Sequence, residues 1–159
     1  MLRKFRIKDL QRVMYINTLC LPENYSEFFY ISLHEKFPNT FIVAIIEDNI
    51  IGYIMCRMET GFSELGKWNI TKKGHVVSIA VLPEYRKMGI GTSLMLQAMK
   101  EMKNYGMKEC YLEVRASNQI AKNLYRKIGF KEVKTIQGYY RDREAAKVMA
   151  VNLDILSTN

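Results

Sequence analysis

The chain is poor in the residue types that build disulfide frameworks and metal sites. Its 159 residues include three cysteines, an odd number, and only two histidines, and no two cysteines have the CxxC spacing. Cys20, Cys56 and Cys110 each lie in an apolar stretch, where we expect small buried side chains and not nucleophiles. The sequence therefore predicts neither a disulfide framework nor a metal site.

Long hydrophobic runs and linker-like segments are also lacking. The longest aliphatic run, residues 41–46, is far shorter than the roughly 20 residues of a membrane-spanning helix. The start, MLRKFRIKDL, alternates charged and apolar residues, which does not suit a secretory signal. No linker, repeat or low-complexity tract divides the sequence. These features predict one domain, residues 1–159, located in the cytoplasm.

Acidic residues are in the minority. Lys and Arg number 24 against 16 Asp and Glu, a formal net charge of +8 that favours nucleic acid, the ribosome or a phosphate-rich cofactor as partner. A nucleic-acid module would lack the usual RNP, KH or C₂H₂ signatures. Its binding surface would use five lysines that we expect to be exposed, namely Lys100, Lys103, Lys108, Lys122 and Lys127.

The hydrophobic pattern predicts a mixed α/β fold. Apolar, β-branched runs predict strands at residues 2–7, 41–47, 49–59, 74–83, 108–115, 130–136 and 146–153. Helical spacing predicts helices at residues 9–20, about 28–37, 91–105 and 118–128. The order β-α-α-β-β-β-α-β-α-β-β predicts about seven strands and four helices, with a parallel, right-handed unit at the centre.

Polar residues and glycines mark where these elements end. Asp9 is the expected cap of the first helix, and Ser117 or Asn118 that of the fourth. Asp48-Asn49 is typical of a hairpin turn, and Gly106 suits the left-handed position after a helix. The second helix is expected to be aromatic on one side, through Phe28, Phe29, Ile31, Ser32 and Phe37.

A basic, glycine-containing stretch, RKMGIGT at residues 86–92, separates a predicted strand from a predicted helix. Unpaired N–H groups and the positive dipole at a helix start favour an anion, and glycine lets it approach the main chain. No lysine follows Gly91, as a Walker loop requires, and Leu94 replaces the third glycine of a dinucleotide fingerprint. A solvated turn that caps the helix is the alternative to a phosphate site.

Two motifs resemble those of the GNAT superfamily of N-acetyltransferases. Arg86, Gly89 and Gly91 fit [Arg/Gln]-x-x-Gly-x-[Gly/Ala], which is similar to that family's acetyl-CoA pyrophosphate loop. Residues 118–130 match its second signature, N-x-x-A-x-x-L-Y-x-x-x-G-F, at every fixed position. The stretches LPENY, from residue 21, and GYY, from residue 138, further resemble the Ard1/RimI-type branch that acetylates protein N-termini.

The resemblance implies the GNAT fold and direct acetyl transfer from acetyl-CoA to the α-amine of a polypeptide, with CoA as product. It implies that the strand at residues 77–81 splays from its parallel neighbour, so that amides near Ile79 and Val81 bind pantetheine and the thioester oxygen. The implied cofactor-binding residues are Ile79, Ala80, Val81, Arg86, Lys87, Met88, Gly89, Ile90, Gly91, Thr92, Asn118 and Tyr125.

The resemblance also implies that Tyr125 protonates the departing thiolate, although its place on an apolar helical stripe equally suits core packing. Asn118 is implied to contact the cofactor as well as to cap a helix. The candidates for the general base are His75, Glu113 and Glu23, of which Glu113 has the alternative of pairing with Arg115. A modest base suffices, because an α-amine has a pKa of about 7.7–8.0.

Two loops are implied to flank the peptide entrance, with a closed aromatic lid as the alternative. The implied substrate-binding residues are Leu21, Glu23, Tyr25, His75, Tyr139 and Tyr140. The branch commonly continues GYY-x-D-G-E-D-A, whereas this chain has GYYRDREAA. We expect Arg143 to disfavour a positive φ and to attract acidic second residues of the substrate.

Three functions remain distinguishable at this point. An N-terminal acetyltransferase, working as a monomer or weak dimer with ribosome association, accounts for the most residues. An acetyltransferase of lysine or small amines would favour polyamines or internal lysines over peptide α-amines. A basic module for RNA or the ribosome would bind RNA with steep salt dependence and would lack affinity for acetyl-CoA.

Overall fold

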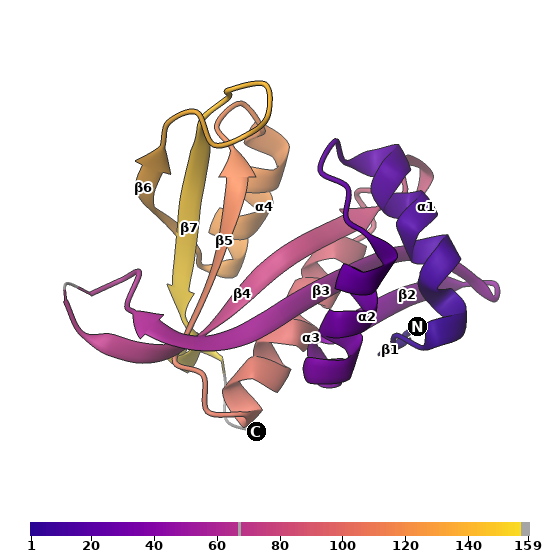
Figure 1. The fold of residues 1–159 in the computed structure, drawn as a ribbon, viewed down its shortest axis with the longest axis horizontal. Coiled ribbons are helices and arrows are strands. Elements are labelled where there is room, and N and C mark those ends of the chain that lie inside the picture. The colour runs from indigo at the N-terminus through magenta and orange to yellow at the C-terminus, as the bar shows by residue number, and fades with distance from the viewer. Residues whose placement is uncertain (67, 157–159) are drawn as a thin grey trace. The chain divides into compact units, whose positions relative to one another are not determined.

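The computed structural model describes residues 1–66 and 68–156. Seven strands form one mixed sheet in the order β1-β2-β3-β4-β5-β7-β6 (Figure 1). The strands are β1 (Leu2–Lys4), β2 (Phe41–Ile46), β3 (Asn49–Phe62), β4 (Ile70–Val81), β5 (Glu109–Arg115), β6 (Lys131–Ile136) and β7 (Ala146–Asn152). The α-helices are α1 (Leu10–Cys20), α2 (Glu27–Lys36), α3 (Ile90–Asn104) and α4 (Gln119–Ile128). The predicted order of strands and helices is confirmed.

The chain divides into two compact units. The first unit comprises Met1–Arg57 and Val76–Glu101, and the second comprises Met58–His75 and the described chain from Met102 onward. Within the described ranges, no helix combines the length and the apolar character that crossing a membrane requires.

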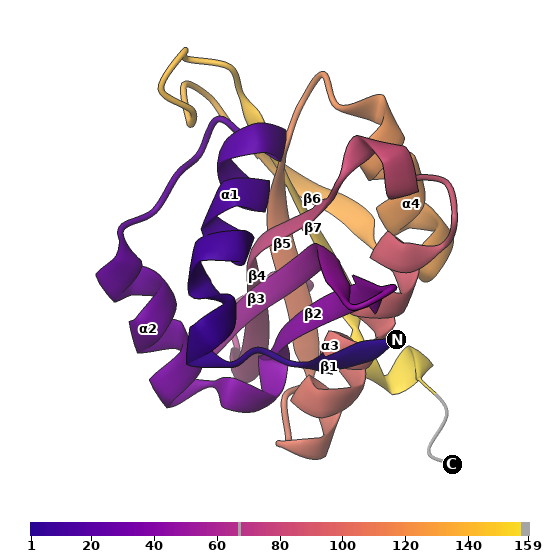
Figure 2. The same cartoon turned by 90° about the vertical axis from the view of Figure 1, so that its right-hand side faces the viewer.

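In the first unit, β1, β2 and the start of β3 pair in antiparallel fashion. The β2–β3 turn consists of Glu47 and Asp48, with φ of 50° and 64°, so the predicted hairpin exists but turns one residue earlier than Asp48-Asn49. Two successive left-handed residues are what a two-residue hairpin turn requires. Figure 2 shows α1 and α2 on one side of these strands and α3 on the other.

Two predictions about helices in the first unit were wrong. Asp9 occupies the N-cap position of α1, but its side chain makes no capping hydrogen bond; the carboxylate accepts hydrogen bonds from the Arg3 guanidinium, at 2.7 and 3.0 Å, and from the Arg6 N–H at 2.8 Å. The one-sided aromatic pattern expected for α2 also fails, because α2 buries Tyr30 and Leu33 while Phe28 is 80% exposed. Tyr30 and Leu33 are three residues apart and so lie on one face of the helix. This spacing, and not aromatic character, decides which side chains of α2 are buried.

In the second unit, β5 pairs in parallel with β4 and in antiparallel fashion with β7, which also pairs with β6. Asn118 caps α4 as predicted, because its Oδ1 accepts the Ala121 N–H at 3.1 Å. Gly129 and Gly106 follow helices with φ of 126° and 86°, which confirms the predicted left-handed backbone at Gly106.

The predicted surface of five lysines needs correction in the second unit. Lys122 is only 5% exposed, and its Nζ donates to the Ala116 carbonyl at 2.6 Å. Lys103 is half-buried, with its Nζ donating to the Leu156 carbonyl at 2.7 Å. Long lysine stems cover apolar surface while their ammonium groups reach backbone oxygens, so sequence position alone does not establish exposure.

Candidate functional site

The predicted anion loop of the first unit leads directly into α3. Lys87 and Gly89 both have left-handed backbone, with φ of 65° and 80°. The first bond of the helical ladder runs from the Ser93 N–H to the Gly89 carbonyl at 3.0 Å. The N–H groups of residues 90–92 therefore precede the ladder and have no partner within the helix.

Gly89 leaves one side of this loop open. A Cβ built on Gly89 would meet no heavy atom of the described residues within 4 Å. Lys87 and Met88 beside it are exposed, whereas Gly91 and Thr92 are half-buried. An open glycine, a lysine and a helix N-terminus together form a suitable environment for a phosphate group.

Arg86, the first residue of the loop motif, contacts the strand that precedes it. Its Nε donates to the Val81 carbonyl at 2.9 Å, and the Cys20 Sγ lies 3.7 Å from the same oxygen. The guanidinium therefore fastens the start of the loop to the end of β4. This contact places a cation at the loop independently of any ligand.

The second half of β4 is held from the side of α1. The Tyr25 hydroxyl donates to the Val77 carbonyl at 3.4 Å. Tyr53 lies in a buried chain of hydrogen bonds, 2.7 Å from the Ser78 Oγ and 2.9 Å from the Asn17 Nδ2 that donates to it. The sequence gives no signal for these hydrogen bonds, because they join residues that are far apart in sequence and of types that are common in cores.

The other predicted residues of the first unit lie around these contacts. Ile79 and Val81 are half-buried and Ala80 is buried, in agreement with one side of β4 being accessible. Leu21 and Glu23 are half-buried in the loop after α1, where the Leu21 N–H donates to the Asn17 carbonyl at 2.9 Å.

The second unit brings His75 and Glu113 together. The His75 Nε2 lies 2.8 and 3.0 Å from the two carboxylate oxygens of Glu113, and the side chains are 9% and 16% exposed. The parallel register that contains His75 covers Lys73–His75 of β4 and ends there within the described chain. The Tyr139 hydroxyl donates to the Glu113 Oε1 at 3.3 Å. Three of the predicted site residues thus form one polar cluster.

Tyr125 is nearly enclosed in the second unit, with 8% of its surface exposed and its ring centroid 5.9 Å from that of Phe130. Burial raises the pKa of Tyr125 from 10.0 to about 12. The phenol therefore carries its proton throughout the neutral range, as a proton donor must.

The loop of Tyr139 and Tyr140 is fastened by Arg115. Its Nη1 lies 2.9 Å from an Asp142 oxygen and 3.0 Å from a Glu144 oxygen, and its guanidinium stacks over Tyr140 at 4.1 Å. Arg115 therefore pairs with Asp142 and Glu144, while Glu113 binds His75. This role of Arg115 was not predicted, and the acidic residues in RDRE were the one signal for it in the sequence.

The expectation that arginine would keep position 143 out of a positive φ was wrong. Arg143 has a φ of 73°. Its N–H donates to the Tyr140 carbonyl at 2.8 Å, and the Tyr140 N–H donates to the Glu144 carbonyl at 3.2 Å. These two hydrogen bonds, together with the contacts of Arg115, hold the turn in a conformation that an L-residue adopts only at a cost of about 1 kcal/mol.

Arg143→Gly is accordingly expected to raise the free energy of unfolding by about 0.5–1 kcal/mol, because glycine adopts a positive φ without the steric cost. Urea denaturation measures the change. Arg143→Ala, which retains a Cβ, is the matched control and should leave the midpoint within error of the parent. A glycine variant that is less stable than the alanine variant would contradict strain at this position.

Comparison with known proteins identifies the family of this chain. Residues 10–130 match the Acetyltransferase (GNAT) family. The chain belongs to this family. It is 49% identical over 154 residues to an N-alpha-acetyltransferase of Sulfurisphaera tokodaii, and the match covers 96% of this chain and 92% of that protein.

Solved structures of GNAT proteins share the fold. The crystal structure of Ard1 from Thermoplasma volcanium has a TM-score of 0.83 and 27% identity, covering 96% of each chain. Arabidopsis thaliana Naa50, in complex with the bisubstrate analogue CoA-Ac-MVNAL, has a TM-score of 0.81 and 28% identity, covering 95% of this chain and 97% of that one. The predicted GNAT fold is thereby confirmed, and the protein is an acetyl-CoA-dependent acyltransferase.

Proposed function

We propose that this GNAT protein transfers acetyl directly from acetyl-CoA to the α-amine of a polypeptide. The observation that carries the proposal is the pairing of His75 with Glu113 in a chain 49% identical to an N-alpha-acetyltransferase. An α-amine with a pKa of about 8 is partly unprotonated at neutral pH, so a modest base suffices to take its proton.

The proposed reaction is a nucleophilic substitution at the thioester carbon. The amine nitrogen bonds to the acetyl carbon, the C–S bond of the thioester breaks, and the amine loses a proton as CoA departs. Glu113 accepts that proton, directly or through a water, and the His75 Nε2 at 2.8 Å stabilises the carboxylate by a hydrogen bond. Glu23, half-buried in the loop after α1, stays the third candidate for this role.

Tyr125 is the proposed acid for the departing thiolate. Its pKa of about 12 keeps the phenol protonated. The departing thiolate, whose thiol has a pKa near that of cysteine, about 8.5, is stabilised by accepting a hydrogen bond or a proton from the phenol. At the end of the turnover Glu113 releases to solvent the proton that it took from the amine, and Tyr125 regains from solvent any proton that it gave to the thiolate, so both groups return to their starting state.

The proposed cofactor site uses the anion loop of the first unit. The N–H groups of residues 90–92 and the Lys87 ammonium would hold the diphosphate of CoA, with Arg86, Met88 and Gly89 shaping the loop. Main-chain groups of Ile79, Ala80 and Val81 would bind the pantetheine arm and the thioester oxygen, which becomes an oxyanion during attack. In the second unit, Asn118, which caps α4, is a further proposed contact of the cofactor.

The proposed peptide-binding residues come from two loops. Tyr25 in one and Tyr139 and Tyr140 in the other offer hydroxyl groups that bind the backbone of the first substrate residues without selecting among side chains. Leu21 would contribute apolar surface in the loop that holds Tyr25. The protein would meet its substrates in the cytoplasm as a monomer or weak dimer, and its charge of +8 favours association with the ribosome.

The charge of Arg143 predicts a preference at the second substrate residue. Peptides with glutamate at this position should be acetylated about two- to fivefold faster, measured as kcat/KM, than otherwise identical peptides with lysine, because rim charges change association modestly. Raising the salt concentration should narrow the difference. Equal rates for the two peptides at low salt would contradict the preference.

The acetylation reaction itself is tested with three amines. Release of CoA from acetyl-CoA should be rapid with a peptide that has a free α-amine and near background with the same peptide when its α-amine is blocked and an internal lysine is free. A polyamine is the third acceptor. Faster turnover of the lysine peptide or the polyamine would instead support an acetyltransferase of lysine or small amines.

Cofactor binding is tested separately by thermal unfolding. Acetyl-CoA at about 100 times its Kd should stabilise the protein by about 2.7 kcal/mol, because a ligand that binds the folded state shifts the unfolding equilibrium. ATP and NAD at the same concentration should raise the midpoint far less. Equal shifts for all three would indicate a general phosphate site and would contradict a specific acetyl-CoA site.

A further inference from the structure

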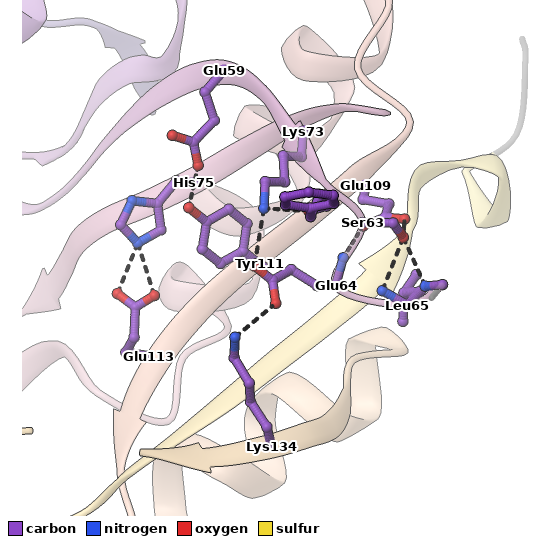
Figure 3. Close-up of polar contacts among 12 residues, drawn as sticks. Glu59, Ser63, Glu64, Leu65, Lys73, His75, Glu109, Tyr111, Glu113 and Lys134 are labelled. Atoms are coloured by element: carbon purple, nitrogen blue, oxygen red, sulfur yellow. Dashed lines mark hydrogen bonds and ion pairs between the residues drawn. The ribbon is translucent and has the colours of Figure 1, made fainter. Parts of the chain in front are cut away.

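We propose that Tyr111 is a positioning residue that fixes the imidazole of His75 against the Glu113 carboxylate. The proposal rests on the proposed function, because it concerns the orientation of the pair assigned as base. Tyr111 was not among the residues singled out in the sequence. Its contacts in the second unit, drawn in Figure 3, carry the inference.

The backbone places Tyr111 beside His75. The two residues are partners in the parallel register of β4 and β5, in the last pair of that register within the described chain. Their rings stack, with centroids 4.5 Å apart and planes inclined by 12°. Glu113 follows Tyr111 by two residues on β5, so the strand alternation directs both side chains to the same face.

Tyr111 is itself held on two sides. Its hydroxyl donates to the Glu59 carboxylate, and the Lys73 Nζ lies 4.7 Å from its ring centroid. Lys73 is fixed in turn, because its Nζ donates to the Phe62 carbonyl at 2.6 Å and to a Glu64 oxygen at 3.0 Å. Figure 3 shows the Tyr111 ring between His75 and Lys73. The Tyr111 ring is therefore held in one position and does not rotate as an exposed side chain would.

A ring held in this position affects the orientation of His75, because the χ2 torsion of histidine has a broad energy minimum. Rotation about χ2 costs little over a broad range, and it would carry the Nε2 away from the two Glu113 oxygens that it now contacts. A parallel ring at stacking distance restricts that rotation to orientations in which the planes stay aligned. Catalytic groups misplaced by about 1 Å lose up to about 100-fold in rate, so such restriction is of the size that affects turnover.

Two substitutions separate the ring of Tyr111 from its hydroxyl. Tyr111→Phe keeps the stacking surface and loses only the bond to Glu59, whereas Tyr111→Leu removes the flat ring and leaves an apolar side chain. We expect Tyr111→Leu to lower kcat about tenfold with little change in the peptide KM. Tyr111→Phe should keep a kcat close to that of the parent. Tyr105→Leu, the same change at an exposed position, is the matched control.

A double-mutant cycle with His75→Ala distinguishes positioning from general structural support. If Tyr111 acts through His75, Tyr111→Leu should have no further effect on kcat once His75 is absent. A further tenfold loss in the His75→Ala background would overturn the proposal. His75→Ala with the activity of the parent would instead overturn the assignment of His75 to the base pair.

NMR tests the positioning without any activity measurement. The chain has two histidines, so the imidazole resonances of His75 are assigned by comparison with His75→Ala. The stacked Tyr111 ring should shift the His75 protons upfield, and Tyr111→Leu should abolish this shift while Tyr111→Phe preserves it. His75 resonances that are identical in the parent and in Tyr111→Leu would overturn the proposal even if the enzyme is an N-terminal acetyltransferase.

Discussion

Replacement of Glu113 by glutamine is expected to lower kcat by about 100-fold, the typical contribution of a positioned general base. Glutamine has nearly the same shape and its carbonyl oxygen still accepts the hydrogen bond that the His75 Nε2 makes at 2.8 Å. The amide cannot take a proton from the attacking amine. The substitution therefore removes the proposed chemistry while it keeps the geometry.

Single-turnover acetylation of a peptide with a free α-amine measures this loss. The Kd for acetyl-CoA should stay within about twofold of the parent, because a base acts in the transition state and not in cofactor binding. Glu35→Gln, at an exposed position of α2, is the matched control and should retain full activity. A Glu113→Gln variant with more than half the parent rate would exclude Glu113 as base and would leave His75 and Glu23 as candidates.

The parts of the fold and of the anion loop that could be predicted from the sequence depend on interactions between residues close together in the chain. Asn118 begins α4 because its side chain satisfies the Ala121 N–H, an interaction that spans three residues. Gly106, with a φ of 86°, ends a helix because glycine adopts this backbone freely. Hydrophobic periodicity is also a local signal, because apolar residues recur with one spacing in strands and with another in helices.

Contacts between distant segments explain what could not be predicted. Tyr53 is 36 residues from Asn17 and 25 from Ser78, yet hydrogen bonds join all three under β4. Arg115 binds Asp142, which lies 27 residues away, and in the second unit this contact fixes the loop of two predicted substrate residues. Propensity rules exclude neither arrangement, but they hold no information about which polar residues meet after folding.

The backbone of Arg143 is another feature that local rules do not predict. A non-glycine residue with positive φ is disfavoured locally, which made the expectation for Arg143 reasonable. The turn nevertheless holds Arg143 at a φ of 73°, because its N–H and that of Tyr140 both find backbone acceptors. Tertiary hydrogen bonds of this kind outweigh a local cost of about 1 kcal/mol.

Tyr125→Phe is expected to lower kcat by about 10- to 100-fold and to leave the Kd for acetyl-CoA nearly unchanged. The phenylalanine ring fills the same buried space beside Phe130, so the variant loses only the hydroxyl that would protonate the thiolate. An acetyl thioester of a more acidic thiol needs less help from an acid, and the deficit should shrink with that substrate. Tyr105→Phe, at an exposed tyrosine, is the control.

The dependence of stability on pH supplies a second readout for the same variant. Burial raises the pKa of Tyr125 to about 12 in the folded protein, against 10.0 for an ordinary tyrosine. The unfolded chain therefore loses this proton first as the pH rises above 10, and the folded state loses stability between about pH 10 and 12. Tyr125→Phe should unfold with a shallower pH slope in this window. Equal slopes would contradict the raised pKa of Tyr125, whereas weaker acetyl-CoA binding with an unchanged kcat would assign Tyr125 to packing and not to proton donation.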